Sequence, residues 1–90
     1  MKAEKEPILR LLKTARGQID GIIKMVEEDR YCIDISNQLL ATQSILKKTN
    51  KEIIHAHITH CVKDAFDQGD PQERIEKVDE VMQVLEKMMK

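Results

Sequence analysis

The sequence predicts an all-α fold of three helices, of which the central one is by far the longest. Apolar residues recur at helical spacing along most of the chain, and no segment alternates as a strand does. Charged residues make up 34% and hydrophobic residues 41% of the chain, a balance typical of a soluble helical protein. At 90 residues the chain is too short for two domains, so we expect one helical domain over residues 1–90.

The first helix is expected from about Glu6 to Glu28. Pro7 suits its first turn, where the missing N–H is not needed. Gly17 and Gly21 interrupt the helix, each at a cost of about 1 kcal/mol relative to alanine. Such glycines indicate either a close approach between helices or tolerated surface positions. The apolar stripe of this helix consists of Ile8, Leu11, Leu12, Ala15, Ile19, Ile22, Ile23 and Val26.

The second helix is expected from about Tyr31 to Asp67, a stretch without proline or glycine. Gly69 fits the left-handed position that often follows a helix. Asp70 then serves as the N-cap of a third helix, expected from about Pro71 to Met89. The apolar stripe of the third helix consists of Ile75, Val78, Val81, Met82, Leu85 and Met88.

The size of the chain favours an oligomer. A protein this small buries only about 60–65% of the surface that its unfolded chain exposes. The long central helix should present apolar surface that the two shorter helices cannot cover. With one Phe, one Tyr and no Trp, the core must be aliphatic, and an aromatic platform for single-stranded nucleic acid is excluded. We therefore expect a second copy of the chain to cover the long helix.

Two cysteines and one histidine fall on one face of the second helix. Cys32 and Cys61 would lie about 43 Å apart along an unbroken helix, so they cannot meet within one chain. At about 100° per residue, Cys32, His57 and Cys61 share a sector of about 40°, whereas His55 and His60 lie outside it. Antiparallel packing about a two-fold axis would bring Cys32 of one protomer to His57 and Cys61 of its partner. The apolar seam of this dimer would consist of Leu39, Ile45, Leu46 and Ile53.

Two thiolates and one imidazole form a soft, three-coordinate ligand set that suits Cu(I). Zn(II) prefers a fourth ligand, which His60 or water could supply. The alternative to a metal site is that these cysteines and histidines are packing and surface residues. A Cys–His pair could also form a nucleophile, but nothing indicates an oxyanion hole, a Gly-rich loop or a substrate cleft. We therefore do not expect an enzyme.

The net charge of -1, from 15 basic and 16 acidic residues, is not typical of a nucleic-acid-binding protein. Basic residues nevertheless gather in two clusters. An antiparallel dimer would contain each cluster twice, which is enough for contacts with DNA phosphates. The alternative is that these residues are ordinary solvent-exposed charges on helix surfaces. No apolar run approaches the roughly 18 residues of a membrane span and no signal peptide opens the chain, so we expect a cytoplasmic protein. The clusters consist of Arg10, Lys13 and Arg16, and of Lys47, Lys48 and Lys51.

Three segments resemble the copper-sensitive operon repressor family (CsoR/RcnR). They are Arg16-Gly17-Gln18-Ile19, the run from Met25 to Asp34 that contains Arg-Tyr-Cys-Ile-Asp, and His57-Ile58-Thr59-His60-Cys61-Val62. The resemblance covers nearly the whole chain. It implies antiparallel homodimers that assemble into dimer-of-dimers tetramers, and a repressor that binds double-stranded operator DNA until an inducer binds between protomers. Members of the family sense Cu(I), Ni(II)/Co(II), formaldehyde or reactive sulfur species.

The residues at the sensing positions match the copper-sensing branch of this family. Cys32, His57 and Cys61 stand where copper sensors have cysteine, histidine and cysteine. Tyr31 matches a tyrosine that orients the ligands in copper sensors. The resemblance thus implies one Cu(I) per protomer.

Other positions depart from the copper sensors. Their third-helix glutamate aligns with Lys77, so Glu76 and Glu80, which lie nearby, are candidates for its role beside the ligands. Thr14 and Asp20 stand where arginines are common in the first helix. The basic residues that keep DNA-contact positions of the family are Lys13, Arg16 and Lys48.

The sequence therefore predicts a repressor whose apo form binds operator DNA and whose Cu(I) form releases it, derepressing copper-resistance genes. An alternative is a repressor that responds to persulfide or other reactive sulfur, with Cys32 and Cys61 as a redox pair. His57 argues against that alternative, and the missing glutamate argues for it. A third interpretation is a copper-buffering or structural helical protein without sequence-specific DNA binding.

Overall fold

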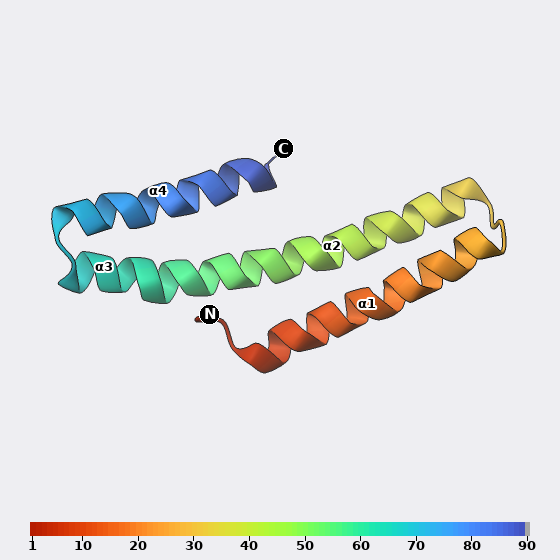
Figure 1. The fold of residues 1–90 in the computed structure, drawn as a ribbon, viewed down its shortest axis with the longest axis horizontal. Helices are drawn as coiled ribbons and strands as arrows, with labels where there is room; N and C mark the ends of the chain where they lie inside the picture. Colours follow the sequence, from red (N-terminus) through yellow and green to blue (C-terminus); the bar gives the residue numbers. More distant parts are fainter. Residues whose placement is uncertain (90) are drawn as a thin grey trace. The chain divides into compact units, whose positions relative to one another are not determined.

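The computed structural model describes residues 1–89, and within this range it contains helices and no strand (Figure 1). The three expected helices are confirmed. The long middle helix consists of three consecutive segments, an α-helix, a π-helical turn and a second short α-helix. The chain forms two compact units, one of Lys5–Asn50 and one of Met1–Glu4 with the residues from Lys51 onward. The elements in chain order are α1 (Lys5–Glu27), α2 (Cys32–His57), the π-helical turn η1 (Ile58–Val62), α3 (Lys63–Gln68) and α4 (Pro71–Met88).

The unit of residues 5–50 is a helical hairpin whose buried residues recur every seven positions. A seven-residue repeat of buried positions on both helices is the pattern of coiled-coil packing. The connection between α1 and α2 is short, which makes the two helices antiparallel neighbours. Because alanine and threonine hold three of the central positions, the helices pack through small side chains. The buried positions are Ile8, Ala15 and Ile22 on α1, and Thr42 and Thr49 on α2.

The turn between α1 and α2 is closed by a left-handed residue that is not glycine. Asp29 has φ 52°, and its N–H donates to the Val26 carbonyl at 3.1 Å. The N–H of Arg30 donates to the Met25 carbonyl at 3.0 Å. These two bonds form a Schellman motif, which ends α1 and directs the chain into α2.

The unit that begins at Lys51 contains the end of α2, η1, α3 and α4. The side chain of Asp70 accepts a hydrogen bond from the N–H of Glu73 at 2.9 Å, and Pro71 opens α4. The expected N-cap and first helical residue are thereby confirmed. From this cap α4 folds back along α3, as the contacts between the two helices require (Figure 1).

The expectation of a left-handed Gly69 is wrong, because its backbone is extended, with φ -84° and ψ 165°. Glycine is needed here for space instead. A Cβ built at this position would lie 2.6 Å from the Ala65 carbonyl oxygen and would also collide with the Glu73 carboxylate. The tight junction between α3 and α4 therefore leaves no room for a side chain. By contrast, a Cβ at Gly17 or Gly21 would meet nothing within 4 Å, so no close helix approach within the chain explains those two glycines.

The central helical run also departs from expectation at Ile58–Val62, where it widens into a π-turn. There the N–H of Lys63 donates to the Ile58 carbonyl, five residues earlier. Within the π-turn, the Thr59 hydroxyl donates to the His55 carbonyl at 2.9 Å and competes with the main-chain bond of a regular α-helix. Such π-turns inside α-helices are frequent at functional sites.

Many large apolar side chains stay exposed in the single chain. The exposed positions on α1 and α2 again follow a seven-residue spacing, next to the buried stripe of the hairpin. No helix within residues 1–89 has the length and apolar content required to cross a membrane. The exposed residues of these stripes are Leu12, Ile19 and Val26 on α1, and Leu39 and Leu46 on α2.

We expect Asp29→Gly to raise the free energy of unfolding by about 0.5–1 kcal/mol, because glycine adopts the left-handed conformation without a Cβ penalty. Urea denaturation at fixed protein concentration measures the change. Asp29→Val is the control and should be destabilising, since a β-branched residue is strained at positive φ. A lower midpoint for the glycine variant would contradict the role of Asp29 in the turn.

We expect Gly69→Ala to lower the free energy of unfolding by about 1–3 kcal/mol, because the added methyl group meets the Ala65 carbonyl. Thermal denaturation followed by circular dichroism measures the loss. The neighbouring Gln68→Ala serves as the control and should change stability by less than about 0.5 kcal/mol. Equal melting temperatures for both variants would show that the α3–α4 junction is not tight.

Candidate functional site

Cys32 is the first residue of α2 and is exposed to solvent. Tyr31 precedes it and is 66% exposed, and its carbonyl accepts the N–H of Ile35 at 3.2 Å. The hydrogen bond makes Tyr31 the residue from which α2 starts. Tyr31 and Cys32 are thus consecutive residues at the start of α2, and both are accessible to another molecule.

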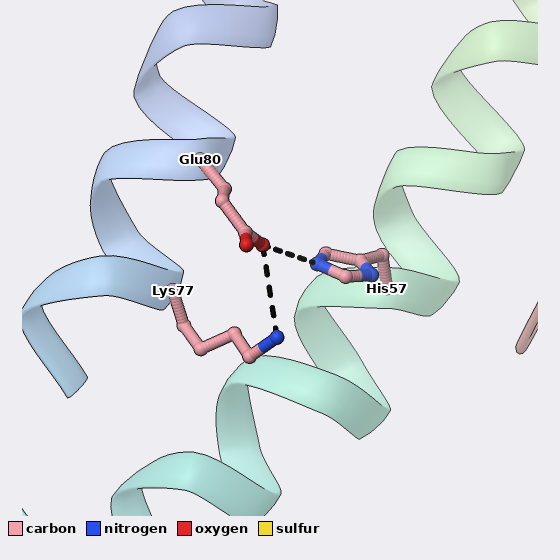
Figure 2. Close-up of polar contacts among 3 residues, drawn as sticks. All are labelled: His57, Lys77 and Glu80. Atoms are coloured by element: carbon pink, nitrogen blue, oxygen red, sulfur yellow. Dashed lines mark ion pairs between the residues drawn. The ribbon is translucent and has the colours of Figure 1, made fainter. Parts of the chain in front are cut away.

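His57 is the last residue of α2, and its half-buried ring contacts α4. The Nε2 atom of His57 lies 3.8 Å from Oε2 of Glu80 (Figure 2). The same carboxylate oxygen lies 3.8 Å from Nζ of Lys77, one helical turn earlier in α4. One oxygen of Glu80 thus faces both a ring nitrogen and an ammonium group.

Of the two acidic residues expected near the ligands, the structure brings Glu80 to His57 and turns Glu76 elsewhere. The Oε1 atom of Glu76 accepts a hydrogen bond from Nε2 of Gln72 at 3.4 Å, within α4. Lys77 reaches the same place indirectly, through its contact with Glu80. The spacing of Lys77 and Glu80, three apart on a helix, is the sequence signal for this ion pair.

Cys61 lies in the π-turn η1, four residues after His57, and is half-buried. Because Cys61 lies inside the π-turn, its angle around the helix relative to His57 is not that of the regular α-helix assumed from the sequence. His55 and His60, which were expected to lie off the shared face, are both exposed. Within one chain, over residues 1–89, no three His, Cys, Asp or Glu side chains gather as a metal site.

All the basic residues expected to contact DNA are exposed. Within the described range none of them takes part in a salt bridge, since the recorded ion pairs involve other side chains. Their charges are therefore available to phosphate groups. They comprise Arg10, Lys13 and Arg16 on α1, and Lys47, Lys48 and Lys51 on α2.

Comparison with known proteins identifies the family of this chain. Residues 4–87 match the family described as "Metal-sensitive transcriptional repressor". The copper-sensing transcriptional repressor CsoR of Bacillus subtilis (strain 168) is 40% identical over 87 residues, which cover 97% of this chain and 83% of that protein. The CsoR of Mycobacterium tuberculosis (strain H37Rv) is 40% identical over 78 residues, covering 87% of this chain. The chain spans 66% of that mycobacterial relative's length.

Solved structures agree in fold. The copper-sensing repressor CsoR with Cu(I) from Geobacillus thermodenitrificans NG80-2 superposes with a TM-score of 0.85 at 36% identity, covering 94% of this chain and 85% of that one. The nickel-responsive transcriptional regulator InrS, with a TM-score of 0.80 at 22% identity over 92% of this chain and 93% of its own, shares the fold.

The resemblance seen in the sequence is thereby confirmed, and with it the expectation that the chain is not an enzyme, since these relatives are transcriptional repressors. The chain belongs to the family of metal-sensitive transcriptional repressors, the CsoR/RcnR family.

Proposed function

We propose that this chain is a Cu(I)-responsive repressor of the cytoplasm. It binds operator DNA without copper and releases it when Cu(I) is bound, so that copper-resistance genes are expressed. The observation that carries the proposal is a Cys–His–Cys donor set whose histidine is linked to α4 through Glu80. The 40% identical relatives named as copper-sensing repressors support Cu(I) as the effector.

The donor set fits Cu(I) on chemical grounds. Both cysteines are free thiols, and thiolates together with one imidazole suit a soft, low-coordinate ion. Because Nε2 of His57 faces the Glu80 carboxylate, a proton on Nε2 leaves the lone pair of Nδ1 for the metal. Cys32, His57 and Cys61 would hold one Cu(I) per protomer, and Tyr31, beside Cys32, would hydrogen-bond to the ligands. When bound, Cu(I) would link these thiolate and imidazole side chains through coordination bonds.

The site requires two protomers. One chain does not gather the ligands within residues 1–89, and α2 carries an exposed stripe of Cys32, Leu39 and Leu46 at seven-residue spacing. Antiparallel pairing of two α2 helices along this stripe would bring Cys32 to His57 and Cys61 of the partner subunit. The apolar residues Ile75, Val78 and Met82 of α4 stay exposed and are available for a dimer-of-dimers tetramer.

The contact between His57 and Glu80 supports a route from the metal to the rest of the repressor. The Glu80 carboxylate, 3.8 Å from Nε2, would orient the His57 ring as a metal ligand and connect it to α4. DNA release follows only if the metal-bound conformation has the lower affinity for DNA, and a tenfold loss requires about 1.4 kcal/mol of coupling. The exposed basic residues of α1 and α2 would make the phosphate contacts that are lost.

Fluorescence anisotropy of the reduced protein on DNA from its own upstream region tests the proposal under anaerobic conditions. We expect release at about one Cu(I) per protomer and no release by inorganic polysulfide. Cys32→Ala and His57→Ala should bind DNA like the wild type but fail to release it with copper. His60→Ala, an exposed histidine beside the site, is the matched control and should respond normally. Release by polysulfide alone would replace the copper proposal with a sulfur-responsive one.

We expect Glu80→Gln to bind DNA normally without copper but to lose about 10–100-fold in Cu(I) affinity or in copper-dependent release, because the His57 ring loses its charged partner. Competition with a chromophoric chelator measures the affinity, and anisotropy measures release. Glu76→Gln is the matched control, four residues earlier in α4 and bonded to Gln72 instead. Equal behaviour of the two variants would remove Glu80 from the proposed route.

A further inference from the structure

The packed stripe of α1 contains a single polar residue. Its half-buried and buried positions follow a heptad pattern, and all but Gln18 are apolar. On α2 the facing stripe has Thr42, only 4% exposed, close to the middle of the hairpin. The members of the α1 stripe are Ile8, Leu11, Ala15, Gln18, Ile22 and Met25.

Gln18 and Thr42 are bonded to each other. The Thr42 hydroxyl lies 2.8 Å from Oε1 of Gln18 and 3.1 Å from the Gln38 carbonyl of its own helix. In the unit of residues 5–50 this is the one side-chain hydrogen bond that joins α1 to α2. Thr49, equally buried one heptad later, bonds only the Ile45 carbonyl of its own helix at 2.8 Å. The two threonines therefore differ in one respect, the bond across the hairpin.

We propose that Gln18 and Thr42 form a polar layer that fixes the register of α1 on α2 and thereby positions the basic face of α1 for operator DNA. This inference rests on the proposed function. It assigns a positioning role to two residues that do not belong to the metal ligands or to the basic clusters. Single polar layers in coiled coils select a register in the same way, at some expense of stability.

The physical basis is the loss of a hydrogen bond to a half-buried amide oxygen at a packed helix contact. If α1 slid so that Gln18 faced Ile45 in place of Thr42, its amide oxygen would lose this hydrogen bond and face an apolar side chain. The other stripe positions are all apolar, and since apolar contacts are not directional, they find apolar neighbours in more than one register. The polar bond is thus the feature that distinguishes one register from the next.

A register change would alter DNA binding, because all residues of the helix α1 would shift together. Sliding by one turn displaces Arg10, Lys13 and Arg16 together by about 5.4 Å. Such a displacement far exceeds what a charge-assisted hydrogen bond of about 2.7–2.9 Å tolerates, so the contacts would be lost as a set. The second acceptor of the Thr42 hydroxyl, the Gln38 carbonyl, keeps the donor satisfied when the bond across the hairpin breaks.

The test compares isosteric variants of the two threonines in the apo protein. Thr42→Val removes the hydroxyl at constant shape, Thr42→Ser restores it, and Thr49→Val is the matched control. We expect Thr42→Val to lower operator affinity at least tenfold, with the other two within twofold of the wild type. We also expect a smaller salt dependence of binding in Thr42→Val, because fewer phosphates are contacted. A purely structural role would change the melting temperature and leave that dependence intact.

Hydrogen–deuterium exchange of α1 provides a readout that does not need DNA. Exchange in the turns around Gln18 should rise in Thr42→Val and stay unchanged in Thr49→Val. Equal affinity and exchange for these two variants would overturn the inference. If the wild type bound no operator DNA, the proposed function would fail, and the exchange comparison would still decide whether Thr42 fixes the register. Faster exchange with unchanged DNA affinity would refute the link to DNA.

Discussion

The heptad contact between α1 and α2 is the constraint on which the rest of the molecule depends. Its buried positions include Ala15, Thr42 and Thr49, so the helices pack through a narrow strip of small side chains. A narrow strip leaves the adjacent apolar positions, such as Leu12 and Leu39, in solvent. The exposed apolar positions of the hairpin are thus the surface that the proposed dimer would cover with a second copy of the chain.

The candidate metal ligands lie at or near the two ends of α2. Cys32 opens α2, whereas His57 closes it and Cys61 follows in the π-turn. In the proposed site, which needs Cys32 from one protomer and His57 and Cys61 from its partner, copper would bind only to the assembled dimer. The π-turn adds a second effect, because it aims Cys61 differently from a regular helix just where the ring of His57 meets α4.

The position of α4 explains why Glu80, and not Glu76, meets the histidine. The N-cap of Asp70 and the crowded backbone at Gly69 set where α4 begins and how closely it folds back on α3. That start fixes which turn of α4 reaches His57, and it is the turn of Lys77 and Glu80. The carboxylate that meets His57 is therefore that of Glu80, which also contacts Lys77 one turn earlier in the same helix.

The sequence by itself determined the helices, the cap at Asp70, the family and the set of candidate ligands. These follow from local rules, because periodicity, proline position and motif spacing act over a few residues. Only the tertiary structure decided the choice of Glu80, the π-turn before Lys63, the extended Gly69 and the bond from Thr42 to Gln18. Each of these depends on how one helix meets another or on a one-residue change of backbone hydrogen bonding, and helical periodicity along a single segment carries no information about either.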